Sequence, residues 1–286
     1  MPDPRALARS RRALLGWYGP RRRAYPWRGA RDPYRILVSE VMLQQTQAPR
    51  VVPAYRSFLR RFPTLRALAA APRRDVVLAW AGLGYNRRAV ALSEAARAIV
   101  RVHGGRVPSE LAALQALPGI GSYTAAAVAS IAFGVPVAAI DTNVRRIAAR
   151  VIDGTDEVSP ARERELAAAW LDAGRPGDWN QALMDLGREV CRPRPRCDAC
   201  PLRPGCRFVA LGVTPLPARR RQGAFEGSFR QVRGAVVRVL RERGTATVAD
   251  LAGLTGADAA RVAVAVERLR EDGLVEVRRD RIRLAG

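Results

Sequence analysis

The segment LPGIGSYT, residues 117–124, joins two stretches in which apolar residues recur at three- and four-residue spacing. Gly119 and Gly121 leave backbone N–H groups unblocked in this tight turn, and the helix expected to follow presents its positive end there. Such a turn favours a site for one phosphate group. Taken alone, the segment would also suit an ordinary connection between two helices.

A second glycine turn strengthens the first interpretation. The sequence GLGY, residues 82–85, precedes a basic stretch that contains Arg87 and Arg88. Two such turns in one chain favour binding to the DNA backbone without reading its sequence.

Outward from these turns, the chain up to about Phe208 is expected to be almost entirely helical. Helices are predicted near residues 5–18, 33–45, 48–61, 64–70, 73–81, 86–103, 109–115, 122–133, 142–151, 160–172 and 178–190. Residues 212–227 are rich in Pro, Gly and Arg and are expected to be a linker. Residues 228–286 predict three helices and a hairpin, with Gly273 as a helix cap, in the pattern of a winged helix.

The charge of the chain favours a polyanionic partner. The 286 residues carry a formal net charge of +23, and all 49 basic residues are arginine. Residues 228–286 contain 12 arginines against eight acidic residues, so the main basic surface is expected before them. Biased composition of the source genome would also raise the arginine content. The lack of lysine excludes any mechanism that needs a lysine Schiff base.

The four cysteines form one compact group: Cys191, Cys197, Cys200 and Cys206. A disulfide scaffold would spread them along the chain. A single C-x2-C pair inside one short loop suits a 4Fe–4S cluster better than zinc, although zinc stays an alternative. We expect the cluster to fasten the surrounding helices and to position the arginines of the loop.

The N-terminus and the most apolar segment indicate where in the cell the protein is located. The first ten residues lack the apolar region of a secretory signal, and the run 125–140 is too short and alanine-rich to span a bilayer. We therefore expect a monomeric, cytoplasmic protein associated with the nucleoid and not with a membrane.

Taken together, the motifs resemble those of helix-hairpin-helix DNA glycosylases that carry an iron–sulfur cluster. SEVMLQQTQ (39–47), YPWR (25–28), GLGY (82–85) and NQALMDLG (180–187) resemble, more narrowly, the MutY family of adenine DNA glycosylases. The resemblance covers about residues 10–210. It implies a mainly α, two-lobed fold, followed by the linker and by the winged-helix-like α+β segment, residues 228–286. One lobe is a six-helix domain, residues 32–135, and the other comprises residues 1–31 and 136–211 with the cysteine loop.

The resemblance also assigns a catalytic group. Glu40 stands in an apolar stretch, where burial would raise its pKa, and it matches the residue that protonates adenine N7. Asp141 has the pattern of a helix N-cap and matches the carboxylate that faces the sugar, either electrostatically or through a covalent adduct. Tyr123 stands where bifunctional relatives have a catalytic lysine, which implies a monofunctional enzyme. Without the resemblance, Glu40 would suit the solvent face of a helix.

Further residues match positions that contact DNA or the base. Gln45 resembles the side chain that fills the gap left by an extruded base, and Tyr85 the aromatic wedge beside 8-oxoguanine. Trp27 and Arg28 are expected to line the adenine pocket, and Asp185 to read the edge of adenine. The alternative for Trp27 and Asp185 is a purely structural role, in the core or on the surface of a helix.

The chain departs from the family pattern in three places. Asn86 replaces a second tyrosine, and the first cysteine gap is five residues where six are expected. The Nudix-like domain that helps to recognise 8-oxoguanine is replaced by about 60 residues, so its role cannot be carried over to residues 228–286. Shortened members of the actinobacterial type have a similar organisation.

These features together predict a monofunctional glycosylase of base excision repair. Its expected partner is double-stranded DNA with mismatched or oxidised bases, and its expected substrate is adenine opposite 8-oxoguanine or guanine. One alternative is an enzyme of the same fold that removes thymine from T·G pairs, or hypoxanthine. Another is an iron–sulfur DNA-binding regulator without catalytic activity.

Overall fold

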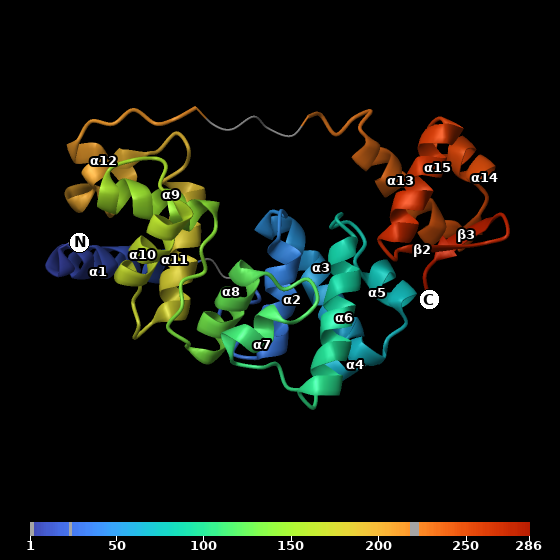
Figure 1. The fold of residues 1–286 in the computed structure, drawn as a ribbon, viewed down its shortest axis with the longest axis horizontal. Helices are drawn as coiled ribbons and strands as arrows, with labels where there is room; N and C mark the ends of the chain where they lie inside the picture. Colours follow the sequence, from blue (N-terminus) through green and yellow to red (C-terminus); the bar gives the residue numbers. More distant parts are fainter. Residues whose placement is uncertain (1–2, 23–24, 218–222) are drawn as a thin grey trace. The chain divides into compact units, whose positions relative to one another are not determined.

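The computed structural model describes residues 3–22, 25–217 and 223–286, so residues 218–222 of the expected linker lie outside the described part. Helices dominate, as the sequence predicts, and a small sheet lies near the C-terminus (Figure 1). The chain divides into two compact units, residues 1–40 with 107–219, and residues 41–106 with 220–286. Among the described helices, none combines the length and apolar character of a transmembrane span.

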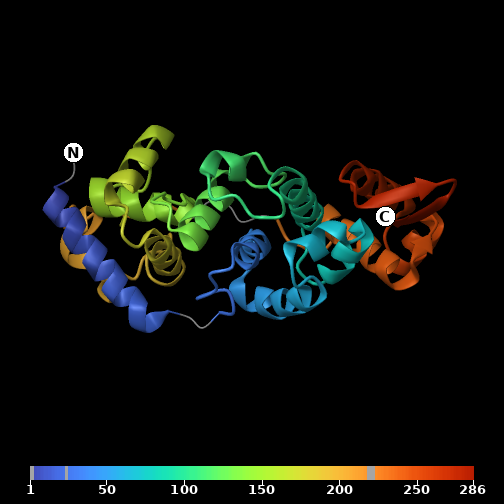
Figure 2. The same ribbon diagram turned by 90° about the horizontal axis from the view of Figure 1, so that it is seen from below.

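The first unit is built around α11 (Pro176–Glu189), which packs against α1 (Pro4–Arg21), α8 (Ser122–Phe133) and α9 (Thr142–Ala148). Figure 2 shows α1 lying along the helices of this unit. Trp170 and Trp179 meet edge to face at 5.9 Å between ring centroids, and both are fully buried. The remaining helices of the unit are α7 (Leu111–Gln115), α10 (Pro160–Trp170) and α12 (Arg207–Ala210), with short 3-10 turns at Cys197–Ala199 and Arg203–Gly205.

One helix of this unit ends differently from its prediction. The sequence predicts a single helix over residues 142–151, whereas α9 changes at Ala148 into a π-helical turn, Ala149–Asp153. Gly154 ends that turn with φ 77°, a conformation that favours glycine. The wider turn occurs where Arg150 packs beside the cysteine loop.

The hairpin between α7 and α8 sets its apolar residues inward and its glycines outward. Leu117 and Ile120 are buried, whereas Gly119 and Gly121 are exposed. Gly119 has φ 71°, and Gly121 is the N-cap of α8. The first hydrogen bond of α8 runs from the Ala125 N–H to the Gly121 carbonyl, so the preceding amides form the positive end of the helix.

The second unit begins with four helices of the main helical region: α3 (Ala48–Arg61), α4 (Leu65–Ala70), α5 (Arg73–Ala79) and α6 (Arg87–Val102). Phe58 packs edge to face against both Phe62 and Trp80. The boundary between the two units lies inside α2 (Pro33–Leu43), directly after Glu40.

The C-terminal segment belongs to the second unit and has the expected winged-helix order. It contains α13 (Phe229–Arg243), α14 (Val248–Thr255) and α15 (Ala259–Glu271), then the hairpin of β2 (Val275–Arg278) and β3 (Arg281–Leu284). Gly273 follows α15 with φ 67°, in agreement with its predicted capping role. Strand β1 (Thr245–Ala246), which the sequence does not predict, pairs antiparallel with β3 and gives the order β1-β3-β2. Two residues are too short a run for strand periodicity to reveal.

The C-terminal segment shares a hydrophobic core with α5 and α6. Val77 of α5 and Val90 of α6 belong to the same buried cluster as Val236 and Leu240 of α13. The Arg241 guanidinium donates to the Val77 carbonyl at 2.7 Å. The segment is therefore an integral part of the second unit.

Candidate active site

Glu40 lies on α2 with its side chain buried. Burial raises the pKa of its carboxyl group from 4.5 to about 7. Arg28 and a hydrogen bond with Tyr123 act against this rise, whereas the negative charge of Asp141 adds to it. The group can therefore carry a proton near neutral pH, as an acid catalyst requires.

Tyr123, in the first turn of α8, is the hydrogen-bond partner of Glu40. Burial raises its pKa well above 10, and the negative charges of Glu40 and Asp141 act in the same direction. Its hydroxyl is hydrogen-bonded to Glu40 and also lies 3.4 Å from the Met184 sulfur. The phenol keeps its proton, so it serves Glu40 as a hydrogen-bond donor and not as a base.

Arg28 is held in a buried polar network that the sequence analysis only partly identified. Its guanidinium donates to the Tyr18 hydroxyl at 2.7 Å, to the Gln181 carbonyl oxygen, and to Asp185 at 2.9 Å. Tyr18 in turn donates to Gln181 at 2.7 Å. Tyr18 lies in a helical pattern typical of the core, and Gln181, although it belongs to the NQALMDLG motif, was given no role of its own.

Asp185 lies on α11 and is buried, not on a helix surface. Its Oδ1 atom accepts hydrogen bonds from both Arg28 and Arg188, the latter at 2.6 Å. The carboxylate therefore balances the charge of Arg28, which acts on the pKa of Glu40. Trp27 is also buried and stacks on Tyr25 at 5.1 Å between ring centroids. The expected contacts of Asp185 and Trp27 with adenine stay predictions.

Asp141 is the N-cap of α9, as its sequence pattern indicates. Its carboxylate accepts from the backbone N–H groups of Asn143 and Val144 at 2.8 and 2.7 Å, and from the Asn143 side chain at 2.8 Å. These three donors fix the position of the carboxylate at the start of α9. A negative group with this environment is suited to face a developing positive charge.

Two neighbours fix the backbone around Asp141. The buried Asn180 side chain accepts from the Ala139 N–H at 2.8 Å and donates to the Val137 carbonyl at 2.9 Å. A Cβ atom at Gly187 would lie 2.5 Å from Asn143 Cβ, so only glycine allows α11 to approach α9 this closely. Both residues belong to the NQALMDLG motif, and the structure gives that motif a positioning role.

Gln45 and Tyr85 belong to the second unit and share an unusual backbone conformation. Their φ angles are +53° and +46°, and Arg279 is the other non-glycine residue with positive φ in the described part of the chain. Such a conformation is costly for a bulky side chain and persists where the surroundings enforce it. Tyr85 leaves 47% of its surface exposed. The strain thus occurs at the two residues expected to enter the DNA stack.

Arg88 is the residue that holds these two turns, although its sequence context suggested a contact with phosphate. The guanidinium is stacked near the rings of Trp80 and Tyr85, at 5.5 and 5.4 Å from their centroids. It donates to the carbonyl groups of Val41, Met42, Gln44, Leu83 and Gly84, and to the hydroxyl of Thr46. Burial lowers its pKa to about 10, so it stays charged at neutral pH.

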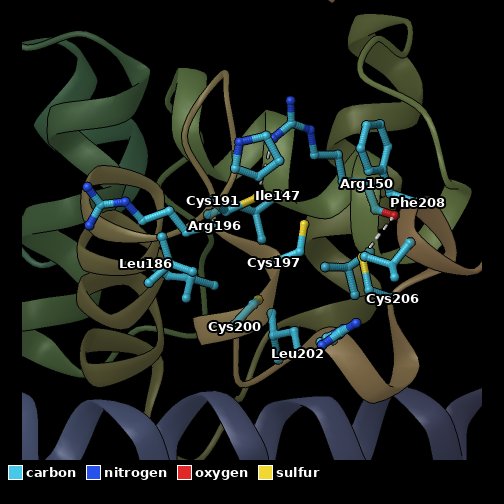
Figure 3. A pocket seen from close by; sticks show the side chains of 15 residues that line it. Ile147, Arg150, Leu186, Cys191, Arg196, Cys197, Cys200, Leu202, Cys206 and Phe208 are labelled. Atoms are coloured by element: carbon cyan, nitrogen blue, oxygen red, sulfur yellow. Dashed lines mark hydrogen bonds between the residues drawn. The ribbon is translucent and has the colours of Figure 1, made fainter. Parts of the chain in front are cut away.

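The four cysteines surround one pocket in the first unit (Figure 3). All four are free thiols, and all four line this pocket. Among the described residues, no three Cys, His, Asp or Glu side chains converge as ligands of a single metal ion. A common pocket lined by four sulfur atoms fits a cluster, whose separate iron atoms each take one thiolate.

Two arginines bind the cysteine loop, and one of them, Arg146, connects it to the neighbourhood of Asp141. Arg150 donates to the carbonyls of Arg192 and Pro193, and its Nη1 lies 3.7 Å from the Cys191 sulfur. Arg146 donates to the Cys191 carbonyl at 2.9 Å and to the Asn143 side chain at 2.8 Å. Asn143 is the residue that holds Asp141, so hydrogen bonds run from the cysteine loop to the candidate catalytic carboxylate.

Comparison with known proteins agrees with this geometry. Residues 38–172 match the HhH-GPD superfamily of base excision DNA repair proteins. The chain is 42% identical to the adenine DNA glycosylase of Mycolicibacterium smegmatis, over 96% of this chain and 95% of that protein. It is 44% identical to the human adenine DNA glycosylase over 69% of this chain and 39% of that protein. A thermostable thymine-DNA glycosylase has a similar structure, with a TM-score of 0.66 and 32% identity, over 72% of this chain and 98% of that one.

The fold, the buried acid and the hairpin thus define a DNA glycosylase of the helix-hairpin-helix superfamily. Within this superfamily, the chain belongs to the family of adenine DNA glycosylases. The match to the Mycolicibacterium protein includes the C-terminal segment, so the short winged-helix-like end is shared with that relative.

The contacts of Arg88 give a testable prediction. In Arg88→Lys, a single ammonium cannot span both turns, so backbone amides near Gln45 and Tyr85 should exchange with solvent about tenfold faster or more. Hydrogen exchange measured by mass spectrometry checks this. Arg56→Lys, at an exposed position on α3, is the matched control and should leave exchange in both turns unchanged. Equal protection in Arg88→Lys and the native chain would refute the holding role.

Proposed function

We propose that the chain hydrolyses the N-glycosidic bond of adenine mispaired with 8-oxoguanine or guanine in double-stranded DNA, and that it acts as a monofunctional enzyme. The observation that carries the proposal is the buried Glu40, whose pKa of about 7 and contact with Tyr123 suit an acid catalyst. The family to which the chain belongs supports adenine as the base. The lack of lysine supports hydrolysis without a Schiff base. Such hydrolysis would leave an abasic site in an intact strand.

The carboxyl group of Glu40 transfers its proton to N7 of the extruded adenine. The bond between C1′ and N9 then breaks, and its electron pair leaves with the base, which protonation has made a better leaving group. Tyr123 donates a hydrogen bond to the Glu40 carboxylate that forms, and thereby stabilises the product of proton transfer.

Asp141 stabilises the positive charge that develops on the sugar. Three hydrogen bonds at the start of α9 hold its carboxylate in place. Water adds to C1′ after the base has left, and the proton released from that water returns to the carboxylate pair. Arg28 and Asp185 balance each other's charge beside this pair.

DNA is held by the two glycine turns and by the arginine-rich surface. Exposed glycines at 119 and 121 allow a phosphate to approach the first amides of α8. Gln45 and Tyr85 enter the stack when the base is extruded, and their strained conformations keep them ready for that position. We propose a monomer as the active form, working on DNA at the nucleoid.

The four cysteines would hold a 4Fe–4S cluster. The donor set consists of thiols alone, and all four line one pocket, as in clusters with one cysteine per iron. The cluster would neutralise the thiolates and fix the loop, whose backbone carbonyls accept hydrogen bonds from Arg146 of α9 and Arg150 of the following turn. No step of the reaction passes through it.

Thymine opposite guanine is the second candidate substrate. The structural similarity to a thymine-DNA glycosylase favours it, since that protein shares the fold at 32% identity. Pocket selectivity between bases rests on few contacts, so the fold does not separate the two substrates.

A panel of duplexes tests the substrate. Duplexes with A·8-oxoguanine, A·G, T·G and hypoxanthine pairs are incubated with the enzyme, and released base and strand breaks are measured with and without alkali. We expect release of adenine from the first two, with strand breaks only after alkali. Release of thymine or hypoxanthine alone would refute the adenine assignment, and binding without any release would favour a regulator.

Glu40→Gln tests the acid. The amide cannot donate a carboxyl proton, so the single-turnover rate should fall by about 10²–10⁴-fold while DNA binding persists. Glu242→Gln, at an exposed position on α13, is the control and should retain the native rate. A native rate in Glu40→Gln would exclude the proposed role.

The pH profile follows from the same residue. Since the active form of Glu40 is protonated and its pKa is about 7, the single-turnover rate should be highest below pH 7. Above that value it should fall about tenfold per pH unit. Rates measured between pH 5.5 and 9 with saturating enzyme check this. A rate that rises with pH through 7 would require a base in place of the acid.

Metal content tests the cysteine loop. Purified without oxygen, the protein should contain iron and acid-labile sulfide in equal amounts, and Cys200→Ser should lose most of both. Asp198→Asn, which changes an exposed side chain in the same loop, should keep the native content. Stoichiometric zinc in place of iron would contradict the cluster.

A further inference from the structure

The C-terminal segment ends in a hairpin whose turn is rich in arginine. Strands β2 and β3 pair so that Arg278 lies directly opposite Arg281, and Arg279 and Asp280 form the loop between them. We call residues 278–281 the wing turn. All four side chains are exposed, and Figures 1 and 2 show the hairpin at an outer edge of the segment. The wing turn therefore presents three positive charges and one negative charge to solvent.

The charges of the wing turn are only loosely compensated by the fold. Like charges that face each other directly across two strands repel. Glu276 is shared between two arginines, with Arg283 at 2.9 Å and Arg278 at 3.6 Å. Arg281 lies 4.0 Å from Asp250. The side chains of Arg278 and Arg281 are 73% and 60% exposed, so both can approach an external anion.

Arg279, at the tip of the hairpin, combines a strained backbone with a free side chain. Its φ is 58°, a conformation in which glycine or asparagine is usual in so short a turn. Its side chain is exposed and has no hydrogen-bond or ion-pair partner among the described residues. Holding a bulky residue in this conformation costs free energy, and the folded chain gains no polar contact in return. The guanidinium is thus available to a partner outside the chain.

The helix before the hairpin is less suited to a polyanion. The second helix of a helix-turn-helix pair commonly enters the major groove of DNA. The exposed residues in the first half of α15 are largely small and apolar, namely Ala259, Ala260, Ala263 and Val264. In its second half, Arg268 pairs with Glu271 at 3.1 Å. Arg270 pairs with Glu267 at 2.6 Å. Of these two surfaces, the wing turn carries the uncompensated positive charge.

We propose that the wing turn binds the phosphate backbone of duplex DNA, in addition to the contacts of the two glycine turns. Guanidinium groups bind phosphate oxygens with paired donors, and such contacts stabilise the complex with any base sequence. The net charge of +23 and the DNA repair superfamily of the chain favour DNA over an acidic protein as the polyanion. This inference rests on the proposed function only in taking duplex DNA as the partner, whichever base is removed.

Arg279→Gly tests the wing turn, because it removes the charge and the strain together. The variant should unfold at about the native temperature, since the strain relieved offsets the added freedom of the unfolded chain. Binding to an undamaged duplex of about 25 base pairs is measured between about 50 and 200 mM salt; the slope of log K against log salt concentration should become shallower by about 0.9, as for one lost phosphate contact. Arg279→Lys keeps the charge and should keep the native slope.

Arg268→Ala is the matched control, because Arg268 is an exposed arginine of the same segment that has its own acidic partner. It should leave the slope unchanged, whereas Arg278→Ala combined with Arg279→Gly should lower it about twice as much as Arg279→Gly alone. An equal loss in the control, or no duplex binding by the native chain, would overturn the proposal.

A native slope in Arg279→Gly would also overturn it and would indicate an acidic protein surface as the partner. The undamaged duplex contains no mispaired adenine, so failure of the proposed function would appear separately, as absence of adenine release in the duplex panel.

Discussion

The balance of charge around Glu40 is the constraint on which the rest of the first unit depends. A carboxyl group that is to keep its proton near neutral pH must be withdrawn from water, and the shift from 4.5 to about 7 corresponds to roughly 3 kcal/mol. Arg28 opposes that shift. The pairing of Arg28 with Asp185, Tyr18 and Gln181 holds its charge in a neutralised network, so the guanidinium can lie near Glu40 without removing the proton.

The two carboxylates differ because their surroundings differ. Glu40 is enclosed by apolar helix packing and meets a single phenol, whereas Asp141 lies at a helix start with three hydrogen-bond donors. Burial favours the neutral form of Glu40, and the three donors hold the carboxylate of Asp141 in one position. Asn180 and Gly187 keep Asp141 in place, because Asn180 joins α11 to the segment before α9 and Gly187 allows α11 to approach α9 closely.

Most helices, the cysteine group and the N-cap role of Asp141 could be predicted from the sequence, because periodicity, spacing and capping are local signals. The polar network around Arg28 could not be predicted, because it joins residues that are far apart in the sequence. Tyr18 and Gln181, which share a hydrogen bond, are separated by 163 residues. Arg88 was expected at a phosphate and instead binds carbonyl groups of two turns, which no local pattern reveals. The short strand β1 also escaped prediction, because it exists only through pairing with β3.

The winged-helix-like segment shares its valine-rich core with α5 and α6, and this arrangement affects how the chain can be divided. Removing residues 228–286 would uncover Val77 and Val90 and leave apolar surface in contact with water. A shortened chain would therefore be expected to self-associate. Because the segment covers these side chains, its evolutionary loss would favour polar substitutions on α5 and α6.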